Sequence, residues 1–156
     1  KKSELMIGKL FPYFFLGLVD LTLAVLMGKW VFEVPLRGSI ALLFCLSSIY
    51  IFVALALGLT ISTVAKTQIL ANQMAMLIGF LPSFLLSGFT FVIANMPLWL
   101  QIITYGIAPR YYVTMLKDIF LKGAGFSFLW METLILVGMM IVGIWIATKS
   151  FKKELR

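Results

Sequence analysis

The feature that most constrains this chain is a long stretch without charge, because residues 67–109 contain no Asp, Glu, Lys or Arg. As one helix these 43 residues would reach about 65 Å, roughly twice the hydrocarbon thickness of a bilayer. Pro82, Pro97 and Pro109 interrupt the stretch, and each proline removes a backbone donor and disturbs the preceding turn. We therefore predict one crossing followed by a short element that re-enters the same face of the membrane. Non-helical backbone at that depth is tolerated where it is buried in protein or lines a wet cavity.

Composition places the chain in the membrane class. Hydrophobic residues make up 62% and charged residues 12% of the 156 residues, and the mean hydropathy is +1.08. Soluble domains have about 45–50% apolar and about 25% charged residues. We predict an all-α integral membrane protein that forms a single transmembrane domain over residues 1–156. The net charge of +7 comes from cations at the ends of apolar runs, where they meet lipid headgroups, so nucleic acid is not an expected partner.

The residue types needed for most catalytic sites are missing. The chain has no histidine, a single cysteine (Cys45) and isolated acidic residues, which excludes a Ser–His–Asp triad and disfavours a metal cluster. It also has no G-x-x-x-x-G-K-[ST] loop for nucleotide phosphates. We therefore expect no enzyme activity and no cofactor in this chain. Because it begins at Lys1 without a methionine, we interpret it as a fragment of a longer protein.

Apolar runs predict four spans, at about residues 10–27, 40–65, 69–89 and 129–147. If the amino end is cytoplasmic, both ends are, and eight cations lie inside against five outside. The inside set is Lys1, Lys2, Lys9, Lys66, Lys149, Lys152, Lys153 and Arg156; the outside set is Lys29, Arg37, Arg110, Lys117 and Lys122. A fifth span at residues 91–108 would give a split of seven to six with the basic tail outside, so the positive-inside rule favours four spans.

Residues 91–122 are predicted to form a re-entrant helical hairpin in the outer leaflet. Asn95 followed by Pro97 resembles a helix start, with Asn95 capping free amides and proline in the first turn. One short helix would cover about residues 97–108, and a second would cover about residues 110–122 and end at Gly123. Tryptophan placement agrees with this topology: Trp30, Trp99 and Trp130 fall at the predicted outer interface and Trp145 near the inner one.

Asp20 is predicted to lie near mid-membrane, about 15 Å into the first span. A carboxylate there should face the bundle interior, protonated or paired. Two interpretations stay open: a polar point on a substrate or proton path, or a protonated carboxyl that bonds a neighbouring helix. Glu132, near the outer end of the fourth span, is interpreted as an interfacial residue.

Ala54, Gly58 and Ser62 recur every four residues, so they share one face of the second span. Small residues let another helix backbone approach closely when lipid gives no hydrophobic drive for association. The face is either a subunit interface or a packing surface within the chain, and the spacing alone does not decide between them.

The specific motifs lie between Leu86 and Gly123. They are LSGFTFVIANMPLWLQ at residues 86–101, IAPRYY at residues 107–112 and IFLKG at residues 119–123. This block resembles the region that joins the last two membrane helices of the type-2 ABC exporter permeases. The opening KKSELMIGK resembles the cytoplasmic segment before the third of their six helices. Val92 departs from the proline of many members, which leaves the geometry of the hairpin entry open.

The resemblance implies the carboxyl-terminal portion of such a permease, with helices three to six. It implies a dimer with a second copy or a homologous permease, embedded in lipid and docked on a cytoplasmic ABC ATPase that binds ATP and Mg. The hairpin and gate residues that it implies are Gly88, Asn95, Pro97, Trp99, Pro109 and Arg110. The residues that it implies for ATPase coupling are Lys1, Lys2, Glu4, Lys9, Lys66 and Gln68.

The function expected from this resemblance is the permease subunit of an ATP-driven exporter, in the bacterial cytoplasmic membrane with a cytoplasmic carboxyl terminus. Two alternatives remain: an ion-coupled carrier or channel centred on Asp20, and a membrane scaffold without transport. The sparse polar residues favour hydrophobic or amphiphilic cargo, but the sequence does not identify the substrate, because one fold serves many functions.

Overall fold

The computed structural model describes the backbone of residues 2–154 and the side chains of residues 7–150. Within these residues all regular structure is helical. Four helical segments are long and apolar enough to cross a membrane: Ile7–Trp30, Ile40–Val64, Gln68–Leu86 and Phe126–Ser150. These helices agree in number with the four predicted spans and lie close to the predicted ranges. The first and fourth spans each begin three residues before the predicted start and end three residues after the predicted end.

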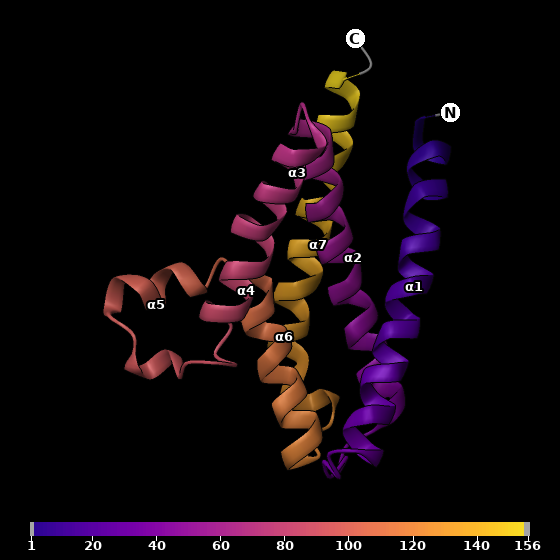
Figure 1. Cartoon of the computed structure of the whole chain (residues 1–156). Helices are drawn as coiled ribbons and strands as arrows, with labels where there is room; N and C mark the ends of the chain where they lie inside the picture. Colours follow the sequence, from indigo (N-terminus) through magenta and orange to yellow (C-terminus); the bar gives the residue numbers. More distant parts are fainter. Residues whose placement is uncertain (1, 155–156) are drawn as a thin grey trace.

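The elements follow one another as four long helical segments with shorter helices between the last two (Figure 1). They are α1 (Lys2–Trp30), α2 (Ile40–Val64), α3 (Gln68–Met74), the π-helix η1 (Ala75–Phe80), α4 (Leu81–Leu86), the 3-10 helix η2 (Ile93–Asn95), α5 (Leu98–Thr104), α6 (Ala108–Lys117), the π-helix η3 (Asp118–Lys122) and α7 (Phe126–Glu154).

The beginning of α1 and the end of α7 lie at one end of the molecule, together with the turn between α2 and α3 (Figure 1). The link between α1 and α2 and the link between η3 and α7 lie at the opposite end. There the backbone N–H of Arg37 donates to the carbonyl of Phe120 at 3.3 Å. Both ends of the described backbone thus lie at the same end of the molecule, as an even number of spans requires.

Short polar residues start the helices of the second and third spans. The Ser39 hydroxyl accepts the backbone N–H of Leu42 at 3.5 Å, and the Thr67 hydroxyl accepts that of Leu70 at 3.2 Å. Each satisfies one of the free amides at a helix start. Gly123 ends η3 with φ +65°, as the predicted helix end at this residue requires.

The third span is helical but irregular, because a proline lies within it. Pro82 has no amide for the carbonyl one turn earlier, and the preceding turn widens into η1, where the N–H of Leu81 donates to Met76. The span ends at Leu86 and not at residue 89. The physical reason is Gly88, whose φ of +81° cannot continue a right-handed helix.

The core lies where α6 and η3 pack against α2 and α7, which also contact each other directly. Its buried residues are Leu43 and Leu46 from α2, Met115 and Ile119 from α6 and η3, and Leu129 and Leu136 from α7. Beside them the Tyr112 and Ser47 hydroxyls are bonded at 2.9 Å, and the Tyr112 ring stacks on Tyr50 with centroids 4.1 Å apart. Both contacts fix the rotation of α6 against α2.

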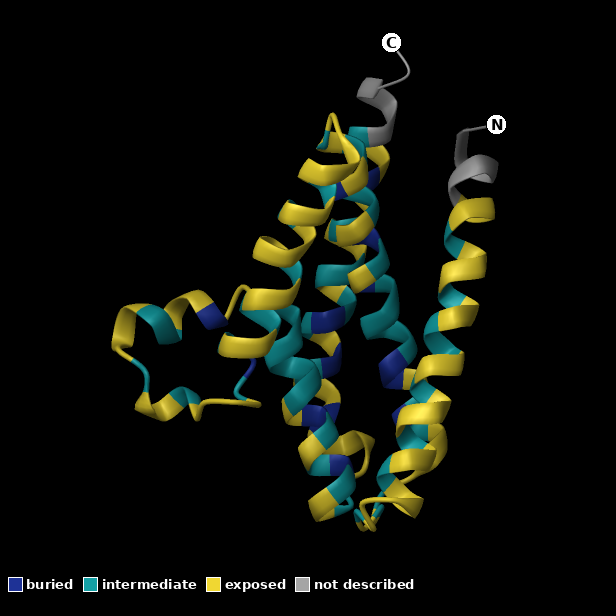
Figure 2. Ribbon diagram, in the orientation of Figure 1, coloured by how far each residue is buried: buried dark blue, intermediate teal, exposed yellow. Residues whose placement is uncertain are grey.

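Most of the remaining apolar side chains are exposed (Figure 2). The buried residues concentrate on α2, α6 and α7, whereas α1 packs against α2 and exposes much of its own surface. A soluble monomer rarely exposes continuous apolar surface on this scale. The fold therefore has the surface of a protein whose outer faces meet lipid or other transmembrane helices.

Candidate functional site

The charge-free stretch contains a lateral segment, residues 87–107, which leaves the bundle after α4 and returns at the start of α6. In Figure 1 its helix α5 projects sideways from the middle of the bundle, and α6 continues to the end that carries the link between α1 and α2. From residue 108 to residue 122 the chain advances about 22 Å. Both short helices predicted for the hairpin exist, the first as the shorter α5 (Leu98–Thr104) and the second as α6 with η3, but α5 does not lie along α6, so a packed hairpin is not observed. Trp99 therefore lies on the projection and not at the end with Trp30 and Trp130.

Gly88 makes the turn by which the chain leaves the third span. Its φ of +81° favours glycine, and an added Cβ would lie 3.0 Å from Cδ1 of Ile93. Its carbonyl accepts a hydrogen bond from Nζ of Lys117 at 2.7 Å. This bond joins residues 29 positions apart and ties the start of the lateral segment to α6.

The start of α5 differs from the prediction. Pro97 is the N-cap residue itself, no side chain caps the helix, and Asn95 ends the short helix η2. Asn95 is therefore not the cap that the sequence suggested. The turn is held instead by Gln101, whose Nε2 donates to the carbonyls of Met96 at 2.8 Å and Ala94 at 3.5 Å. Trp99, two residues after Pro97, is 64% exposed.

Arg110 holds the end of the lateral segment. Its NH1 donates to the Thr104 hydroxyl and to the Gln101 carbonyl, and its guanidinium lies 3.8 Å from the centroid of the Tyr105 ring. Pro109 precedes it in the first turn of α6, where a missing amide costs no helical bond. The planar guanidinium thus supplies a donor to the Gln101 carbonyl near the end of α5.

Several other polar side chains in and around the lateral segment also bond its backbone. The Tyr111 hydroxyl donates to the Tyr105 carbonyl at 2.8 Å, and the Thr90 hydroxyl donates to the Phe84 carbonyl at 2.9 Å. The Ser87 hydroxyl accepts the Phe89 amide at 3.3 Å. In hydrocarbon each unsatisfied backbone group costs several kcal/mol, so internal partners are a condition for leaving the helix at membrane depth.

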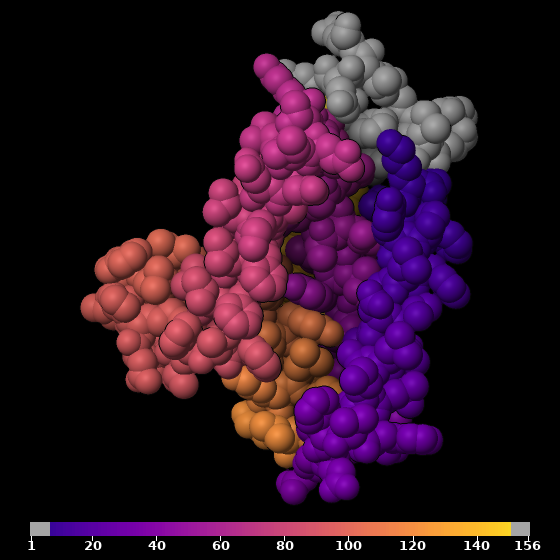
Figure 3. Space-filling view, viewed as in Figure 1, coloured from indigo at the N-terminus to yellow at the C-terminus, as the bar shows by residue number. Residues whose placement is uncertain are grey.

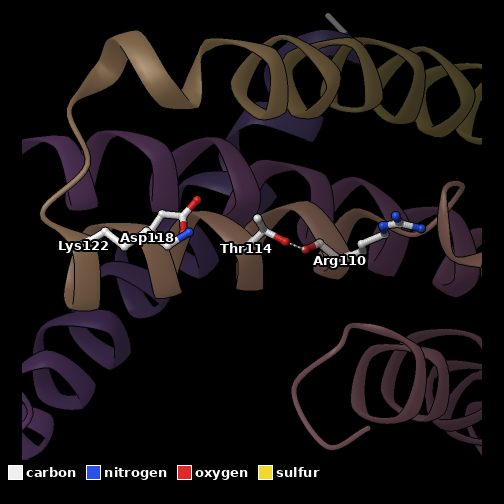
Figure 4. A network of polar contacts seen from close by, with 4 residues as sticks. All are labelled: Arg110, Thr114, Asp118 and Lys122. Atoms are coloured by element: carbon white, nitrogen blue, oxygen red, sulfur yellow. Dashed lines mark hydrogen bonds and ion pairs between the residues drawn. The ribbon is translucent and has the colours of Figure 1, made fainter. Parts of the chain in front are cut away.

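A polar row follows α6 and η3 toward the end of the molecule (Figure 4). The Thr114 hydroxyl donates to the Arg110 carbonyl at 2.9 Å, and the Lys122 ammonium pairs with the Asp118 carboxylate at 2.6 Å. An adjacent face of the helix carries the buried residues Met115 and Ile119. One face of α6 is therefore apolar and packed, and the other is polar.

A groove of about 1180 Å³ separates the third span from α2 and α7. Figure 3 shows the surface hollowed between the segment α3–α4 and α2. Its walls are apolar apart from a few hydroxyl groups, including those of Thr60 and Ser83, and contain no charged residue. Ile103 and the turn before α6 close part of it, so the lateral segment contributes to the wall. A second cavity, of about 550 Å³, lies between α4 and the lateral segment.

Asp20 lies on α1 with its side chain exposed at the surface of the chain. It does not face the interior of these four spans, contrary to the expectation for a buried mid-membrane carboxylate. Glu132 has one buried carboxylate oxygen, Oε2, without a hydrogen-bond partner among the described residues. Within that part of the chain no group of three or more Cys, Asp or Glu could hold a metal ion.

The face of small residues on α2 is open in this chain. Ala54, Gly58 and Ser62 are all exposed, and a Cβ added at Gly58 would meet no atom within 4 Å. Packing within the described chain therefore does not use this face. Close packing occurs elsewhere on α2, where a Cβ at Gly143 of α7 would lie 3.3 Å from that of Ala56.

The residues expected to couple to an ATPase belong to one end of the molecule. Lys66 and Gln68 are exposed at and beside the turn between α2 and α3, and Lys9 is exposed on the first part of α1. Lys1 lies outside the described residues, as do the side chains of Lys2 and Glu4. The turn of residues 65–67 joins the ends of the second and third spans.

Sequence reasoning missed three residues of this site: Gln101, Thr104 and Lys117. The one available signal is periodicity, since Lys117 follows Arg110 by seven residues, which is two helical turns and the same face. Gln101 and Thr104 have no pattern of their own. Gln101 bonds backbone carbonyls that become free only because the chain turns there, and Thr104 accepts a hydrogen bond from the distant Arg110.

Comparison with known proteins gives a consistent result. The family profile described as "ABC-2 family transporter protein" matches residues 1–149. The chain is 40% identical over 151 residues to the "Probable multidrug ABC transporter permease YbhS" of Escherichia coli (strain K12), covering 95% of this chain and 40% of that protein. No solved structure matches the chain significantly.

Two further relatives from the same strain are similar to this chain. The "Probable multidrug ABC transporter permease YbhR" is 32% identical over 127 residues, covering 81% of this chain and 34% of that protein. The "Inner membrane transport permease YhhJ" is 29% identical over 156 residues, covering 97% and 41%. The chain thus spans about two fifths or less of the length of the curated relatives it matches.

Proposed function

Because this chain belongs to the ABC-2 family of transporters, we propose that it forms part of the membrane path of an ATP-driven exporter whose ATPase is a separate cytoplasmic subunit. The four spans make it a multi-pass membrane protein. The names of its Escherichia coli relatives describe permeases, one of them of the inner membrane, and the cytoplasmic membrane is the location that we propose here.

The observation that carries this proposal is the way in which polar side chains satisfy the backbone of the lateral segment. Gln101 and Arg110 bond carbonyls in a stretch that lacks any charge of its own. Such a segment is suited to lie inside the membrane without being a span. We therefore propose that it is re-entrant from the outer face and forms part of an external gate.

The groove supports a proposal for the cargo. Its uncharged apolar walls suit hydrophobic or amphiphilic molecules, because polar cargo would lose its hydration there without compensation. The relatives YbhS and YbhR carry the word multidrug in their names, which agrees with a site defined by apolar shape. Closure of the ATPase would shift the third span against α2 and α7 and so change the width of the groove.

Two exposed surfaces support the proposed partners. The open face of Ala54, Gly58 and Ser62 suits a helix of a second permease copy, since small residues allow close backbone approach. The end with Lys66 and Gln68 suits the ATPase, to which ATP and Mg would bind. The Lys-rich opening of the chain, from Lys1 to Lys9, belongs to the same proposed contact.

Reconstitution tests the function. The full-length permease and its ATPase partner in vesicles should export a hydrophobic dye only with ATP, and the dye should stimulate hydrolysis. Lys66→Ala combined with Gln68→Ala should lower the stimulation, whereas Lys29→Ala at the opposite end should not. Transport without ATP that Asp20→Asn abolishes would instead indicate an ion-coupled carrier. A native complex that contains no ATPase would indicate a scaffold.

A further inference from the structure

Two cations of α6 hold the lateral segment, one at each of its ends. Arg110 bonds Gln101 and Thr104 near the end where the segment returns to the bundle. Lys117 bonds the carbonyl of Gly88 at the end where the segment leaves the bundle. The two lie seven residues apart on one face of the helix, about 10 Å along its axis. No motif and no comparison above assigns a role to Lys117.

The two attachments differ in strength. Arg110 is partly buried and combines hydrogen bonds to two residues with contact to the face of the Tyr105 ring. Lys117 is exposed and bonds a single backbone carbonyl across 29 positions. When the lateral segment moves, we therefore expect the bond from Lys117 to break first and the segment to turn about its contacts with Arg110.

The lateral segment is internally bonded and would move as a unit. Gln101 joins α5 to the turn before it, at the carbonyls of Met96 and Ala94, and the Thr104 hydroxyl donates to the Gln101 carbonyl within α5. The segment forms a wall of both cavities, through Ile103 in the large groove and Val92 in the smaller one. Displacement of the segment would therefore change the opening of both cavities.

Lysine is well suited to alternate between two partners. Its ammonium carries three donors on a long flexible stem, and at this depth it needs an oxygen partner in either state. When Gly88 moves away, the stem is long enough for the ammonium to reach toward headgroup oxygens near the end of α6. The Lys117 ammonium therefore keeps an oxygen partner after it releases the Gly88 carbonyl.

We propose that Lys117 is a positioning residue for transport: its bond to the Gly88 carbonyl holds the start of the lateral segment at α6, and release of this bond allows the groove to open outward. The inference rests on the proposed export function. Lys117 itself touches neither ATP nor, in this arrangement, the cargo.

The test measures segment position and transport separately. A spin label at Leu98→Cys, which replaces a side chain 78% exposed on α5, is paired with one at the exposed Cys45 of α2. Any other cysteine of the full-length protein is replaced, and labelled copies are diluted with unlabelled ones. The distance distribution is recorded for the permease–ATPase complex in lipid nanodiscs, and dye export is measured in vesicles with the same variants.

Lys117→Met is expected to raise the displaced population about tenfold, because a hydrogen bond to a charged group is lost. It is also expected to lower the maximal export rate while the ATP concentration at half-maximal rate stays the same. Lys117→Arg should restore both readouts. Lys122→Met is the matched control, since Lys122 ends η3 and, among the described residues, pairs with Asp118 and not with the lateral segment.

An unchanged distance distribution in Lys117→Met would overturn the attachment itself. A displaced segment with unaltered export would overturn its role in positioning for transport. If the unmodified complex exports nothing with ATP, the proposed export function fails, and the positioning role fails with it; the distances still report separately whether the attachment exists.

Discussion

The packed end of the bundle and the lateral segment come from similarly apolar sequence, but they are held in different ways. Around Leu43, Met115 and Leu136 the helices are held by close contact of buried apolar side chains. In the lateral segment the large side chains are mostly exposed, and single polar groups such as Gln101 and Arg110 bond the backbone. Where a helix of a membrane protein is broken, the position of the broken segment is therefore fixed by hydrogen bonds to its backbone and not by packing of its side chains.

The largest effect is expected from damage to the packed end. Leu43→Ala should lower the free energy of unfolding by about 2–4 kcal/mol, because Leu43 is fully buried and its loss leaves a cavity. Leu57→Ala on the same helix is the control, since Leu57 is 40% exposed. The measurement is denaturant unfolding of the purified permease in detergent. Equal losses for the two variants would show that this core does not hold the bundle.

Gly88→Ala should have the next largest effect, at the junction of the two regions. The left-handed backbone disfavours any side chain and the added methyl would crowd Ile93, so we expect a loss of about 1–3 kcal/mol. Gly125→Ala is the control, because it has negative φ and open space around it. Cysteine accessibility at residue 98 should rise in the first variant only. An unaltered accessibility would mean that the turn at Gly88 does not set the position of α5.

Gly88 also shows how far sequence reasoning reaches. The spans, the turn at Gly123 and the position of Pro109 were predictable, because apolar length, glycine and proline act locally. The bond between Lys117 and Gly88 was not, since its partner is a carbonyl of a distant residue. Asn95 was misassigned because a capping pattern is short and common, and here the chain forms η2 instead. The exposure of Asp20 depends on which helices surround α1, which hydropathy does not specify.

Tyr112→Phe should have a smaller effect, confined to the packed end. It removes one hydrogen bond to Ser47 but keeps the ring stacked on Tyr50, so we expect a loss of about 1 kcal/mol. Combining it with Ser47→Ala in a double-mutant cycle isolates the bond, and the pair should be less than additive. Additive losses would show that the two hydroxyls act independently.

The smallest effect on global stability is expected from Gln101→Leu in the lateral segment. It removes the donor to Met96 and Ala94, which should loosen the turn locally and leave the midpoint of unfolding within about 0.5 kcal/mol of its original value. Amide exchange of residues 94–96 should accelerate, while that of α2 should not. Faster exchange throughout the protein would contradict the separation of the two regions.

The central claim is that the lateral segment lies within the membrane and that the spans on either side of it keep the basic end with Lys66 in the cytoplasm. Impermeant thiol labelling of intact cells tests it directly, with single cysteines at Lys122, Leu98 and Lys66 in a cysteine-free background. We predict rapid labelling at residue 122, none at residue 66 before permeabilisation, and slow labelling at residue 98. Labelling at residue 66 from outside, or labelling at residue 98 as fast as at residue 122, would contradict the account.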